Sequence, residues 1–444
     1  MTDVLSERLR QRRQRNGDAT QAKQSVGRTD WKAWPDYDAA ASGMRNFWYP
    51  VAWSTQIGRK PFGTTIVETP LVLQRDTCGV VHALHDRCLH RGVKLSLGTE
   101  EFPNHISCPY HGWTFRLSDG ELAAVITDGP DSPMKGKVAV QTFPCEEAIG
   151  LVWVFIGDRE PHSLQEQLPV ELNDPPSFAL GGRIEDRSGN WRLYAENGFD
   201  EGHAKFLHRN SKWRTFKTMP TWNKIHIERE GRWIYRVEDE RHWDADFPGL
   251  GTWTNQRWWK QKPKQQRTSG VDNLGNTGGS NAPDPYIAGQ KFPGFASLSL
   301  PGVLRIAYPN FIHYEFYVPI DSEHTRYVGV MLQFKTGLAR SWFYAKYLGG
   351  IRWLFHGGFS AQDHWMVSET NAPPERLYRP DASLLEWRRL VEDGNPFDPG
   401  TPVAIRPGDE APLERSEADS GEEPQRRRQP DPGERNNQEA TDDR

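Results

Sequence analysis

Two short segments near residue 100 each carry one cysteine and one histidine. The first is Cys88-Leu-His90, and the second, after a gap of 17 residues, is Cys108-Pro-Tyr-His111. Thiolates and imidazoles are strong metal ligands, so the four side chains could hold zinc or an iron–sulfur cluster. Zinc sites more often take two cysteines from one tight C-x-x-C loop, and a C-x-H step leaves little room for two ligands on one ion.

One cysteine and one histidine in each segment suit two adjacent metal ions better than one. In a Rieske [2Fe–2S] cluster, two cysteines hold one iron and two histidines hold the other. We therefore interpret the four residues as ligands of such a cluster. Structural zinc is one alternative, and buried side chains that bind nothing are the other. The remaining cysteines, Cys78 and Cys145, fall outside this spacing and are interpreted as ordinary thiols.

A second group of candidate ligands lies in the segment Glu196-Asn-Gly-Phe-Asp200-Glu-Gly-His203-Ala-Lys-Phe-Leu-His208. Two histidines and a carboxylate on one face of a metal leave positions open for dioxygen and substrate, as in non-haem Fe(II) oxygenases. On a regular helix His203 and His208 lie about 140° apart, so the helix must bend or end between them. Two incidental histidines are an equal alternative for this segment alone. An electron-delivering cluster in the same chain favours iron.

The hydrophobic pattern predicts the elements that position these residues. Short β-branched runs separated by turn residues fill residues 44–160, the predicted [2Fe–2S] domain. Residues 161–410, the predicted catalytic domain, mix both patterns: 191–207 and 339–355 are predicted to be helices, and 313–319 one of several strands. The predicted fold class is α+β, with an all-β Rieske domain and a mixed domain that joins an antiparallel sheet to helices in a helix-grip-like arrangement.

Composition and the chain ends narrow the function classes. The 444 residues carry a formal net charge of −4, which gives no field for nucleic acid. No apolar run approaches the roughly 20 residues of a membrane span, and no secretory signal is recognisable, so we expect no membrane partner and a cytoplasmic protein. Residues 1–43 form a polar N-terminal arm. Residues 411–444 are predicted to be disordered because 16 of these 34 residues are charged.

The order of the motifs resembles the terminal oxygenase α subunits of Rieske non-haem iron oxygenases. A Rieske motif is followed by D-x2-H-x4-H and by a late carboxylate, over about residues 44–395. The resemblance implies that His203, His208 and Asp363 bind one Fe(II) per subunit, beside one [2Fe–2S] cluster. His364 is more plausibly structural. Three other carboxylates are weaker rivals for the third place: Asp381, Asp393 and Glu369.

Within that family, five stretches are similar to the group that includes carbazole 1,9a-dioxygenase and 2-oxoquinoline 8-monooxygenase. These stretches are residues 44–50, 86–92, 196–200, 300–304 and 317–321. The similarity implies a homotrimer without a β subunit. It also implies that Asp200 links a cluster histidine of a neighbouring subunit to His203, whereas an iron ligand or a helix-stabilising charge is the alternative role. The chain departs from the carbazole enzyme in having five residues, not four, from His203 to His208.

The resemblance also implies the reaction and its partners. We expect hydroxylation of an aromatic or N-heteroaromatic compound with O2. The chain carries neither a G-x-G-x-x-G fingerprint nor a C-x4-C-x2-C motif, so NAD(P)H electrons must arrive through a separate reductase and ferredoxin. A demethylase or steroid-type hydroxylase is one alternative, and a non-catalytic electron-transfer or zinc-stabilised binding protein is another.

Seven positions are candidates for the substrate pocket: Gly198, Leu304, Ile306, Tyr308, His313, Glu315 and Phe359. In the carbazole enzyme, the segment that matches Gly198 contacts the substrate N–H through a backbone carbonyl. For each side chain, core packing is as plausible as substrate contact. His313 and Glu315 are the more informative pair, because a polar group on a strand among aromatic residues needs a partner.

Overall fold

The computed structural model describes eight stretches of the chain, all within one compact unit: residues 31–173, 178–211, 221–242, 244–254, 296–308, 311–334, 337–370 and 375–397. The predicted tail, residues 411–444, and most of the predicted arm lie outside the described residues. None of the described helices is long and apolar enough to cross a membrane.

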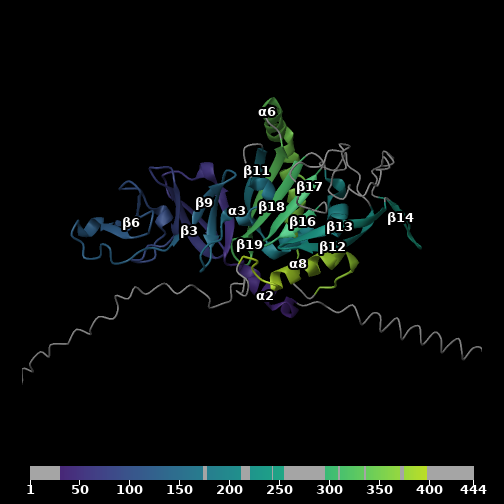
Figure 1. Ribbon diagram of the computed structural model, residues 1–444, viewed down its shortest axis with the longest axis horizontal. Helices are drawn as coiled ribbons and strands as arrows, with labels where there is room; N and C mark the ends of the chain where they lie inside the picture. Colours follow the sequence, from purple (N-terminus) through teal and green to yellow (C-terminus); the bar gives the residue numbers. More distant parts are fainter. Residues whose placement is uncertain are drawn as a thin grey trace, which may run out of the picture. The chain divides into compact units, whose positions relative to one another are not determined.

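The region around the two Cys–His segments is all-β, as predicted (Figure 1). It has three antiparallel sheets with strand orders β1-β10-β9, β2-β3-β4-β8 and β5-β6-β7. Each sheet is small, so the short runs seen in the sequence suffice to build it. The strands are β1 Phe47–Trp53, β2 Phe62–Ile66, β3 Thr69–Arg75, β4 Val81–His85, β5 His105–Ser107, β6 Trp113–Arg116, β7 Leu122–Val125, β8 Thr142–Phe143, β9 Cys145–Ala148 and β10 Leu151–Ile156.

The second region is built on a seven-stranded antiparallel sheet with the order β11-β19-β18-β17-β16-β13-β12. Its strands are β11 Phe178–Ser188, β12 Trp222–Glu230, β13 Trp233–His242, β16 Ala296–Ser299, β17 Val303–Tyr308, β18 Phe311–Pro319 and β19 His324–Phe334. A separate hairpin joins β14 Asp244–Phe247 to β15 Gly251–Thr254. Strand β18 lies inside the sheet, paired on both sides. The α+β prediction is therefore confirmed.

Several of the helices contact strands of this sheet, and two helices carry candidate ligands. Their bounds are α3 Leu164–Gln167, α4 Trp191–Phe199, α5 Glu201–Phe206, α6 Gly337–Lys346, α7 Ser360–Ser368 and α8 Ala382–Glu392. Helix α6 continues through π-helical turns at Tyr347–Ile351 and Trp353–Gly357. Helix α4 contacts both α7 and β18, so it can bring a helix-borne group close to the centre of the sheet.

The helix predicted for residues 191–207 is interrupted in two places: the break after Phe206 lies where a bend was predicted, whereas the break at Asp200 corrects the prediction. Asp200 is extended, with φ −67° and ψ 130°, and its carboxylate caps the first turn of α5. A short 3-10 helix then follows α5, at Leu207–Asn210. The cap supplies the physical reason for the first break, since an aspartate at this place satisfies helix N–H groups that would otherwise be unpaired.

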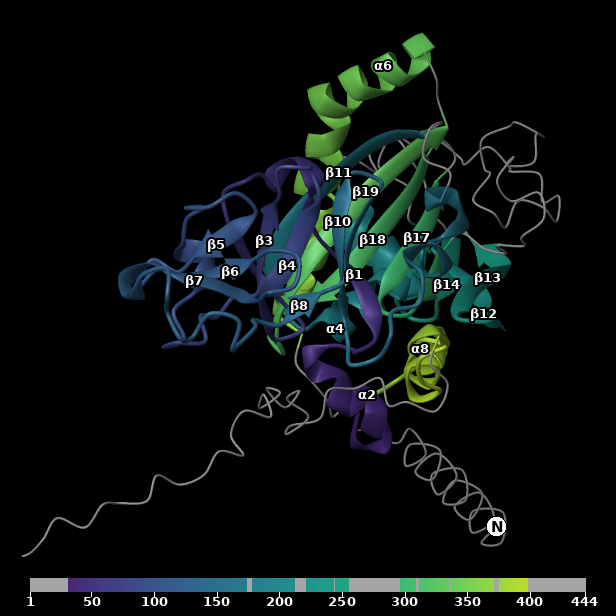
Figure 2. The same ribbon diagram turned by 60° about the vertical axis from the view of Figure 1, so that its left-hand side comes forward.

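Residues 31–43 pack into the core of the second region, through the short helix α2 Pro35–Ala39. The Tyr37 side chain is fully buried, and its hydroxyl donates a hydrogen bond of 2.7 Å to Glu196 Oε1. Arg388 of α8 pairs with the same carboxylate at 2.7 Å. Figures 1 and 2 show α2 and α8 near one another. The predicted domain boundaries, including the one at residue 43, remain predictions.

Candidate metal centres

The two Cys–His segments form loops with the same backbone hydrogen bonds. In the first loop, Cys88 N–H donates to the Val93 carbonyl at 2.8 Å, and Gly92 N–H donates to the Cys88 carbonyl at 2.8 Å. In the second, Cys108 N–H donates to the Trp113 carbonyl at 2.8 Å, and Gly112 N–H donates to the Cys108 carbonyl at 3.1 Å. Both glycines have positive φ, 75° and 65°, which a side chain would disfavour. The same type of backbone turn therefore positions both Cys–His pairs.

These loops bring the four predicted cluster ligands together. The rings of His90 and His111 lie 4.6 Å apart between centroids, and His90 stacks on the Trp113 ring at 5.0 Å. The His111 Nδ1 atom is buried and has no hydrogen-bond partner among the described residues. An unpaired buried ring nitrogen is costly unless a ligand uses it, so the donor set fits a cluster with two imidazole ligands.

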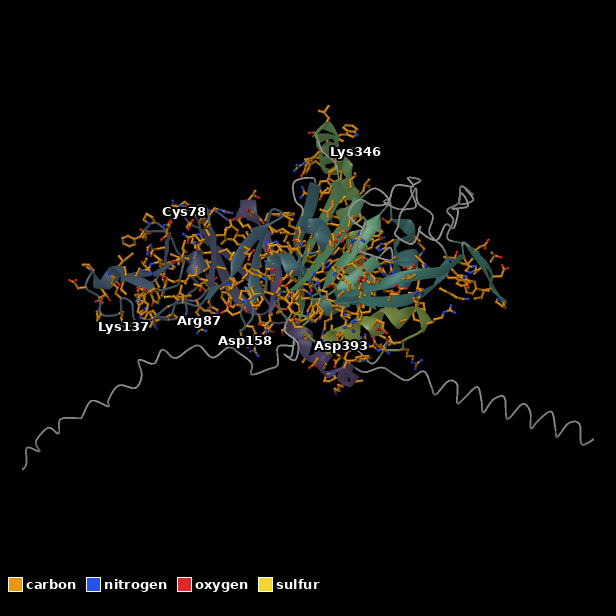
Figure 3. All side chains as sticks on the ribbon, viewed as in Figure 1. Cys78, Arg87, Lys137, Asp158, Lys346 and Asp393 are labelled. Atoms are coloured by element: carbon orange, nitrogen blue, oxygen red, sulfur yellow. The ribbon has the colours of Figure 1, made fainter. Side chains whose placement is uncertain are left out.

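The cysteines of the loops differ from the other two. Cys88 and Cys108 are both buried, and all four cysteines are free of disulfides. Burial, and to a lesser degree the adjacent Cys108 thiol, raises the pKa of Cys88 to about 11. Binding of iron must therefore release a proton from this thiol. Cys78 is exposed at the surface of this all-β region (Figure 3), in line with its interpretation as an ordinary thiol.

In the second region, three predicted ligands converge from distant parts of the sequence. One ligand atom from each of His203, His208 and Asp363 lies within 4.8 Å of the other two. Asp363 Oδ1 is 3.1 Å from His208 Nε2 and 3.5 Å from His203 Nε2. His203 lies on α5, His208 on the 3-10 helix that follows, and Asp363 on α7. The change of winding between the two histidines lets both face one point, despite their five-residue spacing.

The His208 ring shows that this cluster fits a metal ion. Its Nε2 atom is buried and makes no hydrogen bond of acceptable geometry, although Asp363 lies close by. Its other nitrogen, Nδ1, lies 3.0 Å from Gln362 Oε1, which can only accept. Nδ1 therefore donates to Gln362, and Nε2 is the ring atom that faces Asp363. A neutral imidazole oriented in this way is the form that binds a metal.

Asp200 positions His203 through both its side-chain carboxylate and its backbone carbonyl. The carboxylate accepts the Gly202 and His203 backbone N–H groups at 2.7 and 2.8 Å. The Asp200 backbone carbonyl lies 2.9 Å from His203 Nδ1, and the carboxylate oxygen lies 3.6 Å from the same atom. Within one subunit, Asp200 is thus a helix cap that also fixes the His203 tautomer. Its predicted link to a neighbouring subunit remains a prediction.

Mutual electrostatics hold this triad in a charged state before metal binds. Burial raises the pKa of Asp363, but the facing His208 and His203 lower it by more, so it lies below its usual range. Burial lowers the pKa of His203, whereas hydrogen bonds to Asp200 and Asp363 raise it by more, to about 9. Before a metal binds, a proton on His203 therefore supplies the positive charge beside Asp363. This proton must leave when a metal binds.

The rival carboxylates have other partners. Asp393 pairs with Arg229, and Asp381 accepts the Tyr378 backbone N–H at 2.9 Å. Glu369 is exposed just beyond α7. His364, which the sequence favours as structural, lies 2.7 Å from the Tyr194 hydroxyl through Nδ1. Of the carboxylates considered, Asp363 is the one that the structure brings to both histidines.

Six of the seven pocket candidates have described side chains or backbone, and one of them, Phe359, contacts the triad. Phe359 stacks on His208 with ring centroids 3.8 Å apart. A Cβ atom at Gly198 would lie 2.7 Å from Leu304 Cδ2, so the helix backbone touches β17 directly. Strand β18 places Glu315 opposite Leu304 and His313 opposite Ile306. The side chain of Tyr308 lies outside the described residues.

Sequence reasoning missed two residues that hold the candidate ligands in place. Asn197 Nδ2 donates to Asp363 Oδ1 at 3.2 Å, and Gln362 accepts from His208 as described above. Each lies next to a predicted site residue in the sequence: Asn197 beside Gly198, and Gln362 beside Asp363. A polar amide next to a predicted site residue was the signal that could have identified them.

Two regions of the chain match models of known families. Residues 47–144 match the Rieske [2Fe-2S] domain, and residues 155–222 match a model described as homotrimeric ring hydroxylase. The first match covers the four Cys and His residues of the loops, and the second covers Asp200, His203 and His208. Fold and site together define a protein with a Rieske domain joined to a ring-hydroxylase domain.

Known proteins match over most of the chain. The terminal oxygenase component of carbazole 1,9a-dioxygenase from Sphingomonas sp is 33% identical over 400 residues, covering 84% of this chain and 97% of that protein. The structure of the carbazole 1,9a-dioxygenase terminal oxygenase from Novosphingobium sp. KA1 gives a TM-score of 0.66 at 28% identity, covering 85% and 98%. A carbazole 1,9a-dioxygenase oxygenase in reduced complex with ferredoxin gives 0.67 at 24%, covering 82% and 93%, and shows the fold alone.

This chain belongs to the Rieske non-haem iron oxygenases, as a terminal oxygenase component. It is therefore an oxidoreductase, and its cofactors are a [2Fe–2S] cluster and a non-haem iron. The predictions of family, enzyme class and cofactors are confirmed. The zinc-stabilised binding protein, which was kept as an alternative, is set aside by the same matches.

Proposed function

We propose that this protein hydroxylates an aromatic or N-heteroaromatic compound with O2, using NAD(P)H electrons supplied through a reductase and a ferredoxin. The carbazole dioxygenase oxygenases that resemble it support the substrate class, and one of them forms a complex with ferredoxin. The protein would work in the cytoplasm, where NAD(P)H is available. One iron site of this kind supports either monooxygenation or dioxygenation, and the shape of the pocket decides between them.

One observation supports the proposal most directly: ligand atoms of His203, His208 and Asp363 lie within 4.8 Å of one another. The His208 Nε2 atom among them is buried and makes no hydrogen bond of acceptable geometry with the described residues. We assign these three residues as the iron ligands and Cys88, His90, Cys108 and His111 as the cluster ligands. When bound, the cluster supplies single electrons and the iron supplies dioxygen activation. The protein's own part is orientation, since Gln362 holds the His208 ring and Asn197 holds the Asp363 carboxylate.

A trimeric assembly completes this function. The family model that matches residues 155–222 is described as homotrimeric. We therefore propose that the protein is a trimer of identical subunits without a β subunit. In such a ring, Asp200 would link a cluster histidine of one subunit to His203 of the next. Two backbone N–H groups already donate to the Asp200 carboxylate. These hydrogen bonds fix the direction of the lone pairs that remain on its oxygens.

The direct test is turnover of a panel of fused arenes and N-heteroarenes with NADH and a surrogate ferredoxin and reductase. We expect O2- and NADH-dependent hydroxylated products, identified by mass spectrometry, with 18O2 as the source of the new oxygen. The matched control is His208→Ala, which keeps the cluster loops intact and removes one proposed iron ligand. Product from wild type alone supports the proposal. Demethylated products alone, or equal product from both proteins, would contradict it.

A further inference from the structure

Helix α4 carries two side chains that contact α7, the helix of the proposed iron ligand Asp363. Asn197 Nδ2 donates to Asp363 Oδ1 at 3.2 Å, and the Tyr194 hydroxyl lies 2.7 Å from Nδ1 of the adjacent His364. Tyr194 and Asn197 are three positions apart, so they lie on one face of α4. The position of α4 therefore bears directly on the Asp363 carboxylate.

The opposite face of α4 presents two charged side chains to residues 31–42, which we call the N-terminal segment. Arg192 and Glu196 are four positions apart, so they share one face of the helix. At about 3.6 residues per turn, that face lies roughly 150° around the helix axis from the face of Tyr194 and Asn197. The two faces can therefore bind different partners.

Backbone carbonyls of the N-terminal segment accept hydrogen bonds from the start of α4. The side chains of Asn190, Trp191 and Arg192 each donate to a carbonyl between residues 37 and 41, at distances of 2.5–3.0 Å. All three side chains are buried. The Arg192 guanidinium also lies 4.4 Å from the centroid of the Trp31 ring. The first turn of α4 is thus fixed on the N-terminal segment.

A second attachment, at Glu196, lies one residue before Asn197. The Tyr37 hydroxyl donates to Glu196 Oε1 at 2.7 Å, and Arg388 Nε of α8 donates to the same oxygen at 2.8 Å. Tyr37 and Arg388 are fully buried, so water does not replace a donor that is lost. Because Glu196 and Asn197 are consecutive residues of one helix, a shift of the first displaces the second.

We propose that Tyr37 is a positioning residue of the iron site, which acts through Glu196 and α4 on Asn197. The inference rests on the proposed function, because it takes Asp363 as an iron ligand. It extends the iron site to the N-terminal segment, which carries none of the proposed ligands. Since such coupling is reciprocal, a segment that favours iron binding is itself held more firmly when iron is bound.

The test compares two buried tyrosines in matched surroundings. Like Tyr37, Tyr314 of β18 is fully buried, and its hydroxyl donates to a glutamate, Glu171, which an arginine, Arg305, also binds. Tyr37→Phe and Tyr314→Phe each delete one such hydroxyl, and both are expected to lower the melting temperature. We expect Tyr37→Phe alone to lower the affinity for the mononuclear iron, by about 3- to 10-fold.

The affinity is measured on holoenzyme by competition with a chelator, with the cluster spectrum as internal standard. In an Asn197→Ala background, we expect Tyr37→Phe to change the iron affinity by less than about twofold, because the residue through which it acts is gone. Wild-type affinity in Tyr37→Phe, or an equal loss in Tyr314→Phe, overturns the inference. A full effect that persists in the Asn197→Ala background also overturns it.

Hydrogen–deuterium exchange of wild type gives a second measurement that needs no substitution. After a chelator removes the mononuclear iron and leaves the cluster spectrum intact, we expect the backbone amides of residues 36–42 to exchange about threefold faster or more. Those of β3, at residues 69–75, are expected to keep their rates. Unchanged exchange at residues 36–42 overturns the inference. Neither measurement needs turnover, so a failure of the arene panel with normal iron binding contradicts the proposed function alone.

Discussion

The two candidate metal centres of this chain are built in opposite ways. The cluster loops lie 17 residues apart and repeat one backbone turn, in which the cysteine and the glycine four residues later are tied by the same hydrogen bond. The proposed iron ligands lie on α5, on the 3-10 helix that follows it and on α7, and His208 is 154 positions from the Gln362 that orients it. Local sequence therefore builds the first centre, whereas the second depends on the packing of the whole catalytic region.

The largest expected effect comes from breaking the local centre. Cys88→Ser or His111→Ala removes a cluster ligand, and we expect loss of the Rieske absorption and of all NADH-driven turnover. The iron triad lies on other elements, so its iron content is expected to remain. Visible spectra and iron analysis measure both. A normal spectrum in either variant would show that the ligand assignment is wrong.

Asp200→Asn tests the connection between the two centres. Asparagine keeps the size and one acceptor oxygen, but it loses the charge and cannot accept equally from two imidazole N–H groups. We expect both metal centres to stay largely occupied and coupled turnover to fall by about 100-fold.

The measurement for Asp200→Asn is iron content together with single-turnover re-oxidation of the pre-reduced cluster. Re-oxidation at the wild-type rate, with substrate and O2 present, would rule out the linking role. Loss of the mononuclear iron in proportion would instead make Asp200 an iron ligand. A fall in melting temperature alone would leave it as the cap of α5.

Gln362→Leu perturbs the distributed centre without removing a ligand. The substitution deletes the acceptor that fixes the His208 Nδ1–H tautomer, so we expect iron affinity to fall by about 10- to 100-fold. Competition with a chelator measures that affinity while the cluster spectrum serves as an internal standard. Gln56→Leu, at an exposed turn of the Rieske domain, is the matched control. Equal iron affinity in wild type and Gln362→Leu would contradict the role given to Gln362.

Gly112→Ala probes the backbone of the local centre and has the smallest expected effect. A Cβ there would lie 2.7 Å from Ile126 Cβ at φ 65°. Gly231, at φ 58°, has open space around it, so Gly231→Ala reports the backbone cost alone, about 1–2 kcal/mol. We expect Gly112→Ala to lower the melting temperature further. Equal shifts would mean that the loop yields without cost.

The same contrast explains how far the sequence could predict the structure. The four proposed cluster ligands could be predicted from their spacing, because each loop is short and closed on itself. Asp363 follows only from family resemblance, since no local pattern links it to His203. The pair His313 and Glu315 could be placed on one face from strand periodicity. Their partner Tyr327 could not, because the register of β18 against β19 is a tertiary property.

The helical segment illustrates a partial success. The five-residue step between His203 and His208 predicts a departure from regular helix, and the structure has one after Phe206. The earlier break, at Asp200, was not predicted from the sequence. An aspartate that precedes a helix can accept the backbone N–H of the residue three positions later, as Asp200 does from His203. Such a residue is itself a local signal of a helix start.

Counting iron and acid-labile sulfide per subunit tests most directly whether one chain holds two separate iron centres. A two-iron cluster with one mononuclear iron gives about three irons and two sulfides in wild type. Asp363→Ala is expected to give about two irons with both sulfides and an unchanged Rieske spectrum, while Glu369→Ala, at an exposed carboxylate beyond α7, keeps three. Equal iron in wild type and Asp363→Ala would contradict a second iron centre at Asp363.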